Sequence, residues 1–298
     1  MSYLQGVSAP QLTPFHDDGS VNLEEYTRLS EYLAEAGLKG IFVCGTTGEF
    51  VNLTLEERKS LLQAAVKGSK GRCKIMFNVT AMNLQNMKEL WPAVRVGCLQ
   101  YKVKVEKKNE DMWKYLKKDI FKKAKDAIFD YGVNEIPNIK ESRMAYKAFG
   151  KDPSRYRVSS EALIRRIGQG KGLYEVNTVV DVNNLISIES GFSVGSYDTA
   201  NIEEELVFRV GREGETYKGI GKEEINIESL PVLADKKGAI GSSTSDSERA
   251  MITEAATEVL TLIYSFSDND DLEKALEFGQ KYLEKYAGAE EIESWIVS

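Results

Sequence analysis

The stretches NTVVDVNN (residues 177–184) and SVGSYD (residues 193–198) contribute most to the fold assignment of this 298-residue chain. Around them, short strands and turns are expected at residues 174–188, 206–210, 216–220 and 232–234. A short capped helix is expected at residues 160–166, and longer helices at residues 250–266 and 270–287. Strands mixed with segregated helices indicate an α+β domain.

The N-terminal part has a different order of expected elements. Strands are expected at residues 6–13, 39–44 and 73–79. Helices are expected to follow them from Asn22, Thr54 and Asn83, and such alternation is typical of parallel βαβ units. This alternation of strands and helices ends at residues 90–92 (LWP). A strand at residues 94–105 and a long helix ending at Tyr131 follow. The sequence therefore predicts two parts, residues 1–87 and 88–298.

Charge and composition restrict the classes of function. The net charge is −7, which argues against a strongly basic nucleic-acid binder. Residues 102–125 nevertheless carry ten lysines against four acidic residues, and this face is either solvated or directed at RNA. His16 is the only histidine, so most histidine-based catalysis is excluded for the rest of the chain.

The three cysteines, Cys44, Cys73 and Cys98, are odd in number and lack the spacing of metal ligands. We expect them to be reduced in a cytoplasmic protein. The N-terminus has no secretory pattern, and no apolar run approaches the roughly 20 residues of a membrane span. Neither a metal, nor an organic cofactor, nor a membrane partner is expected.

Several motifs in the first part occur at the spacing of a known enzyme family. They are LTPF (12–15), DGSV (18–21), GTTGEF (45–50) and LTLEER (53–58). This pattern resembles the start of the dihydrodipicolinate synthase and N-acetylneuraminate lyase family. The resemblance implies that Thr46 and Thr47 correspond to a turn that binds the carboxylate of a 2-oxo acid.

That family also requires a Schiff-base lysine and a proton-relaying tyrosine from later strands of a full barrel. No later segment of this chain resembles the strand with the lysine. We therefore expect a partial (βα) barrel of two to three units, in which Thr46 and Thr47 are vestigial. Because such a piece leaves an open sheet edge, we expect it to pack on the second part, to pair with another chain, or to be poorly stable.

The second part resembles the B3/B4 domain of the phenylalanyl-tRNA synthetase beta chain, and more closely the free-standing B3/B4 proteins. The resemblance rests on residues 159–166, 177–184 and 193–198 and continues to Thr253. It implies a mixed α/β domain with a pocket that, in the synthetase, hydrolyses tRNA carrying the wrong amino acid. Asn184 matches the pocket asparagine.

Other pocket positions follow from the same resemblance. Residues 241–244 match a glycine-rich pocket wall, which Ser242, Ser243 and Thr244 make more polar here. Asp198 follows a strand turn, where it is either a substrate contact or a cap of the turn.

Two positions depart from the family pattern. The synthetase places a histidine where this chain has Gly195, and an acidic residue where it has Leu262. Asp246, Glu248 and Arg249 offer replacement polarity, and a solvated charged loop is the alternative interpretation.

A basic set precedes the pocket strands. Its members are Lys151, Arg155, Arg157, Arg165, Arg166 and Lys171, of which Arg155, Arg157, Arg165 and Arg166 are the RNA-binding candidates. Arginine forks match phosphate oxygens, so phosphate contact is one interpretation. Ion pairing on a helix surface is the other.

Together these observations predict a cytoplasmic B3/B4-like protein that binds aminoacyl-tRNA or a free amino acid. Hydrolysis of misacylated tRNA in trans, with water as the nucleophile, is part of this hypothesis, and no catalytic residue is assigned. One alternative is a non-catalytic module that binds RNA or an amino acid. The other is a pyruvate-dependent lyase, which the incomplete barrel disfavours.

Overall fold

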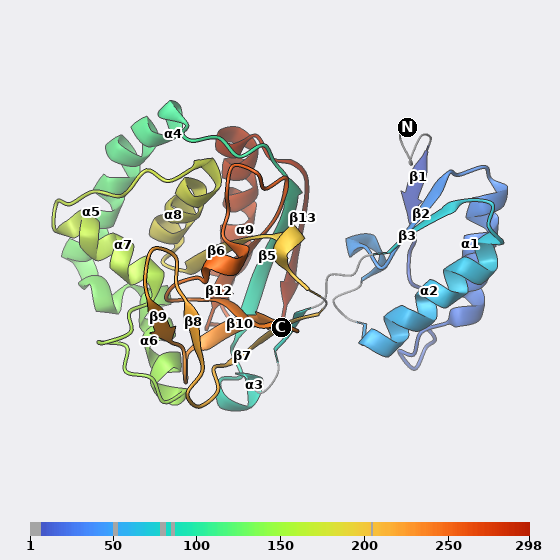
Figure 1. Ribbon diagram of the computed structural model, residues 1–298, viewed down its shortest axis with the longest axis horizontal. Helices are drawn as coiled ribbons and strands as arrows, with labels where there is room; N and C mark the ends of the chain where they lie inside the picture. The colour runs from blue at the N-terminus through green and yellow to red at the C-terminus, as the bar shows by residue number, and fades with distance from the viewer. Residues whose placement is uncertain (1–6, 50–52, 78–81, 85–86, 204) are drawn as a thin grey trace. The chain divides into compact units, whose positions relative to one another are not determined.

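The computed structural model describes residues 7–49, 53–77, 82–84, 87–203 and 205–298. The chain divides into two compact units, Met1–Ala81 and Met82–Ser298. Both are drawn in Figure 1. The division falls six residues before the predicted boundary between residues 87 and 88.

The first unit alternates strands with helices. Its elements are β1 (Ser8–Pro10), α1 (Leu23–Glu35), β2 (Gly40–Val43), α2 (Leu55–Ser69) and β3 (Lys74–Phe77). The strands form a parallel sheet in the order β1-β2-β3. Both helices begin at predicted caps: Asn22 accepts a hydrogen bond from the backbone of Glu25, and Thr54 forms a capping box with Glu57. The alternation expected from the sequence is confirmed.

The second unit contains two four-stranded sheets. One has the order β13-β5-β12-β6, with neighbours antiparallel. Its strands are β5 (Arg95–Lys102), β6 (Ser193–Asp198), β12 (Glu258–Ser265) and β13 (Glu290–Val297). The helices α8 (Thr178–Ser190) and α9 (Asp271–Tyr282) pack against this sheet. Strand β12 lies between β5 and β6, which explains why its residues after Glu258 are buried.

The other sheet has the order β11-β10-β7-β4. Its strands are β4 (Met82–Asn83), β7 (Leu206–Val210), β10 (Pro231–Asp235) and β11 (Gly238–Ser242), and a small hairpin joins β8 (Thr216–Lys218) to β9 (Glu224–Asn226). Phe208 of β7 stacks on Tyr264 of β12 with ring centroids 5.1 Å apart. The core of the unit therefore lies partly between the two sheets.

The remaining helices of the second unit precede β6 in the chain. They are α3 (Met87–Leu90), α4 (Glu110–Tyr115), α5 (Phe121–Tyr131), α6 (Pro137–Ala148) and α7 (Ser159–Gly168), and a π-helical turn at Leu116–Ile120 joins α4 to α5. Helix α7 packs on both α5 and α8. The mixed α and β content matches the predicted fold class.

Two expected elements are wrong. Residues 178–190 form helix α8 instead of strands, and residues 258–265 form strand β12 instead of a helix. Helix α8 is buried on nearly all sides, so its sequence lacks the polar stripe that marks a surface helix. Its β-branched residues therefore resembled a buried strand. Strand β12 is a continuous apolar run, which periodicity alone cannot distinguish from a buried helix.

Smaller elements also differ from expectation. The helix expected from Asn83 is replaced by β4 and the short α3, and α6 and β13 were not predicted.

All three cysteines are free; Cys44 and Cys98 are buried, whereas Cys73 is only half-buried. No helix in the described residues combines the length and apolarity that crossing a bilayer requires.

Candidate functional site

Four tyrosines from separate elements meet around the end of β11. Tyr197 (β6) donates to Asp246 Oδ1 at 2.8 Å and lies 2.6 Å from the Tyr264 hydroxyl of β12. Tyr146 (α6) lies 2.6 Å from the Ser243 hydroxyl, and Tyr217 (β8) donates to Ser242 at 3.2 Å. We call these four tyrosines with Asp246, Ser242 and Ser243 the tyrosine cluster.

Burial sets the proton affinities within the tyrosine cluster. It raises the pKa of the Asp246 carboxyl to about 7, against the opposing effect of hydrogen bonds from the Tyr197 hydroxyl and the Ser242 backbone N–H. Burial also raises the pKa of Tyr146 to about 12 and that of Tyr197 well above its usual value. Asp246 therefore changes charge near neutral pH while its tyrosine neighbours stay protonated.

The two positions that depart from the synthetase pattern lie side by side. Gly195 of β6 and Leu262 of β12 are paired across the sheet. A Cβ atom on Gly195 would lie 2.5 Å from the Tyr197 hydroxyl, and one on Gly241 would overlap both that hydroxyl and the Asp246 carboxylate. The Tyr197 side chain thus occupies the space beside the synthetase's histidine position, and both glycines are needed to admit it.

Asn184, the expected pocket asparagine, lies on α8 and is half-buried. Among the described residues, it makes no hydrogen bond through its amide. Its neighbour Asn183 accepts from Ser196 at 3.0 Å, and Ser196 in turn lies 2.5 Å from Thr261. Since successive strand residues face opposite sides, α8 contacts the face of β6 opposite to Gly195 and Tyr197.

The hydroxyls of the expected pocket wall are engaged within the protein. Ser242 donates to the Ser245 carbonyl at 2.7 Å, and Thr244 lies 2.8 Å from the Tyr146 hydroxyl. Asp198 accepts from the Ala200 backbone and from the Asn201 side chain, so it caps the turn after β6. The structure brings residues 241–244 together with the tyrosine cluster.

The loop after β11 is not a uniformly solvated charged loop. Asp246 is part of the tyrosine cluster, whereas Arg249 forms a two-pronged ion pair with Asp235 at 2.7 Å. Glu248 pairs with Lys218 at 2.9 Å. Of the three residues considered as replacement polarity, only Asp246 joins the tyrosine cluster.

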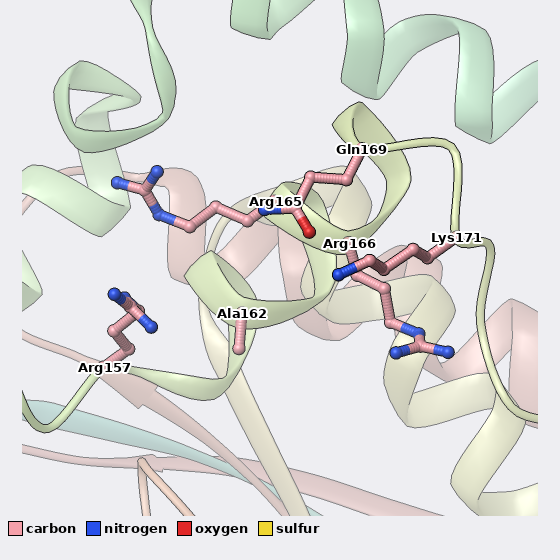
Figure 2. A pocket seen from close by; sticks show the side chains of 6 residues that line it. All are labelled: Arg157, Ala162, Arg165, Arg166, Gln169 and Lys171. Atoms are coloured by element: carbon pink, nitrogen blue, oxygen red, sulfur yellow. The ribbon is translucent and has the colours of Figure 1, made fainter.

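A basic pocket of about 370 Å³ lies along α7. We call it the α7 pocket; it is lined by Arg157, Ala162, Arg165, Arg166, Gln169 and Lys171. Figure 2 shows Arg157 and Arg165 on one side of Ala162, with Arg166 and Lys171 on the other. Three of the four predicted RNA-binding arginines therefore share one concave surface.

The other members of the basic set lie outside this pocket. Arg155 stacks on Tyr156 with its guanidinium carbon 5.7 Å from the ring centroid. Lys151 is buried, donates to the Glu228 carbonyl, and lies 4.0 Å from the centroid of the same ring. Burial lowers the pKa of Lys151.

In the first unit, Thr46 and Thr47 begin a 3-10 turn after β2. Thr47 is exposed, and the side chain of Thr46 lies outside what the structure describes. The Thr13 hydroxyl donates to the Gly48 carbonyl at 2.7 Å and holds the turn against the segment after β1. The turn has the expected place at a strand end, and its former role as a carboxylate site stays a prediction.

Sequence reasoning missed the four tyrosines and the pairing of Asp246 with Tyr197. The one local signal was Tyr197 two residues after Gly195, since these share a face of the strand. Within the described part of the chain, no group of three or more histidine, cysteine or acidic side chains is arranged to hold a metal ion.

Two family models match the chain. The B3/4 domain matches residues 141–288, and the dihydrodipicolinate synthetase family matches residues 3–92.

Curated relatives of the N-terminal segment include the 4-hydroxy-tetrahydrodipicolinate synthase of Methanosphaera stadtmanae. It is 39% identical over 69 residues, which are 23% of each chain. The N-acetylneuraminate lyase of Rattus norvegicus is 36% identical over 89 residues, 29% of this chain and 28% of that protein.

Among solved structures, dihydrodipicolinate synthase from Aquifex aeolicus is 38% identical over 26% of each chain, with a TM-score of 0.25. The chain spans about a quarter of the length of these relatives. It therefore joins a segment of the dihydrodipicolinate synthetase family, at residues 3–92, to a B3/4 domain at residues 141–288.

Proposed function

We propose that the second unit binds the aminoacyl end of a tRNA, or the free amino acid, at the wall formed by residues 241–244. B3/4 domains are a tRNA-binding family. One contact supports the proposal most: the backbone N–H of Ser159, the first residue of α7, donates to the Ser243 carbonyl at 2.8 Å. This bond ties the helix with the α7 pocket directly to the wall.

The spacing along α7 suits a nucleic-acid end. Arg166 follows Ser159 by seven residues, which corresponds to about 10 Å along a helix axis. A short single strand can span that distance, with cations at one end and the hydroxyls of the wall at the other. Thr244 is only half-buried, and its hydroxyl suits the amino group or ester carbonyl of an aminoacyl adenosine.

Binding without hydrolysis is favoured over trans-editing by the packing of Tyr197. Its ring fills the space beside Gly195, and the second unit contains no histidine that could serve as a general base. The Asp246 carboxyl has a pKa near 7, but it is hydrogen-bonded to Tyr197. Hydrolysis of misacylated tRNA in trans is the competing function.

One experiment separates these functions. A panel of misacylated tRNAs is incubated with the full chain, and affinity is measured in parallel for aminoacylated and uncharged tRNA. We expect tighter binding of aminoacylated tRNA, no turnover, and loss of the preference in Thr244→Val. Turnover of any misacylated tRNA would establish the hydrolase instead, and absence of both binding and turnover would overturn the proposal.

A further inference from the structure

The α7 pocket has more positive charge than its surroundings neutralise. Four cations line it, and the carboxylate beneath them is that of Glu161, which is fully buried. Glu161 pairs with Arg165 at 2.8 Å, with Arg143 at 2.7 Å and, more distantly, with Arg157 at 3.8 Å. A single carboxylate therefore faces three guanidinium groups.

The cations on the other side of Ala162 have no such compensation. Arg166 and Lys171 form no ion pair with any described carboxylate, and Arg166 Nε is buried without a hydrogen-bond partner. Buried donors are nearly always paired in folded proteins. An anionic ligand in the pocket would supply the missing negative charge.

An aromatic ring adjoins the pocket. The Arg166 guanidinium lies over the Tyr174 ring, 4.0 Å from its centroid, and Tyr174 is 69% exposed. The carboxylate next in the chain, Glu175, is paired with Lys108 at 2.8 Å and with Lys117 at 3.7 Å, so it does not cancel the charge of the pocket. The surface thus presents two cations without carboxylate partners among the described residues, Arg166 and Lys171, beside the exposed ring of Tyr174.

We infer that the α7 pocket binds a backbone phosphate of single-stranded RNA, with a base stacked against Tyr174. Guanidinium forks suit phosphate oxygens, and aromatic rings accept any base. The small side chain of Ala162 leaves the pocket open between its two pairs of cations. An acidic peptide would satisfy the cations but would not use Tyr174. This inference rests on the proposed tRNA binding, and it adds that the RNA strand contacts the protein at the α7 pocket.

The test uses the full chain and an unacylated, fluorescently labelled oligoadenylate of about eight nucleotides. Binding is followed by fluorescence anisotropy over a range of salt concentrations. Arg166→Gln and Lys171→Gln should each weaken binding about tenfold and reduce the magnitude of the salt slope by about 0.7, since each removes one phosphate contact. Tyr174→Ala should weaken RNA binding while leaving the salt slope unchanged.

Arg155→Gln is the matched control. Arg155 was also an RNA-binding candidate from the sequence and contacts a tyrosine ring, but the structure places it outside the α7 pocket. Its loss should therefore leave binding and salt slope unchanged. Thermal unfolding of each variant reports on folding, and Lys171 is exposed, so its replacement tests the pocket even if Arg166→Gln unfolds.

Competitors identify the ligand chemistry. Inorganic phosphate and AMP should compete only weakly, and polyglutamate should not compete. The inference is overturned if Arg166→Gln and Lys171→Gln bind RNA like the parent chain or no worse than Arg155→Gln. It is equally overturned if AMP binds as tightly as the oligonucleotide or if polyglutamate displaces it. These outcomes leave the preference for aminoacylated tRNA, which tests the proposed function, unaffected.

Discussion

Asp246 holds a titratable proton inside the second unit. Its Oδ1 accepts from the Tyr197 hydroxyl at 2.8 Å and from the Ser242 backbone at 3.3 Å. Burial nevertheless dominates and raises the pKa of the carboxyl to about 7. Between about pH 4 and pH 7 the folded protein therefore binds a proton that the unfolded chain releases, since an unfolded Asp has its usual pKa near 3.8.

This difference makes stability dependent on pH. A group with a raised folded pKa stabilises the fold below that pKa, so the free energy of unfolding should fall as pH rises from 4 to 7. Asp246→Asn keeps an acceptor for Tyr197 but cannot ionise, and it should flatten this part of the profile. Thermal melts at pH 5 and pH 8 measure the effect, at about 2–4 °C for each kcal/mol in a unit of this size. An identical pH profile in the parent chain and Asp246→Asn would contradict the raised pKa.

The structure brings some of the predicted pocket positions together, and the sequence missed other residues for a physical reason. The strand register and the contacts of Tyr197 bring Gly195, Leu262 and Gly241 together, and their role in a substrate pocket stays a prediction. The hydrogen bonds of Tyr197 and Tyr146 join residues 49 to 98 positions apart. Such partners depend on tertiary packing, and no local pattern encodes them.

Helix α7 is anchored by a carboxylate on its buried face. Glu161 accepts from Arg143 of α6 and from Arg165 one turn further along α7. Because Glu161 has no exposed surface, its charge is compensated by these guanidinium groups and, at 3.8 Å, by that of Arg157. Removing one partner of a buried ion pair leaves the others uncompensated.

Glu161→Gln should therefore destabilise the second unit by about 3 kcal/mol. Urea unfolding monitored by tryptophan fluorescence gives the loss in free energy. The matched control is Glu135→Gln, which removes a carboxylate paired with Lys140 at 2.8 Å on the exposed surface. Exposed pairs contribute at most about 1 kcal/mol, so equal losses in the two variants would show that Glu161 does not anchor α7.

Local signals for α8 were present but were outweighed by its composition. Asn177 caps the helix by accepting from the Val180 backbone at 2.9 Å, and Gly191 ends it in the left-handed conformation with φ of 78°. Between them, the β-branched residues of the segment favour a strand when judged alone. Packing against α7, α9 and β6 determines the helix instead.

The second unit needs the residues just before position 88 for its full stability. A fragment starting at residue 88 lacks β4, which pairs with β7, and Met87, which is fully buried. Because of these losses, we expect residues 82–298 to fold and to melt at a higher temperature than residues 88–298. Circular dichroism of both fragments measures the difference, and equal midpoints would show that β4 and Met87 add nothing to the stability of the unit.

The first unit has the three parallel strands of an incomplete barrel. The Schiff-base lysine of the lyase reaction comes from a later strand in the family that this segment resembles, so we expect no imine with pyruvate. Borohydride reduction in the presence of pyruvate, followed by mass spectrometry of the full chain, should reveal no modified lysine. A stable adduct would restore the lyase as a candidate function.

Tyr197 also constrains the order in which this domain can change. A histidine introduced at Gly195 would collide with the tyrosine ring, and any side chain at Gly241 would meet its hydroxyl. While Tyr197 is present, both positions therefore require glycine, because any larger side chain would overlap the tyrosine. Introducing a histidine at position 195 therefore requires a smaller side chain at position 197 first, so substitutions at positions 195, 197 and 241 depend on one another.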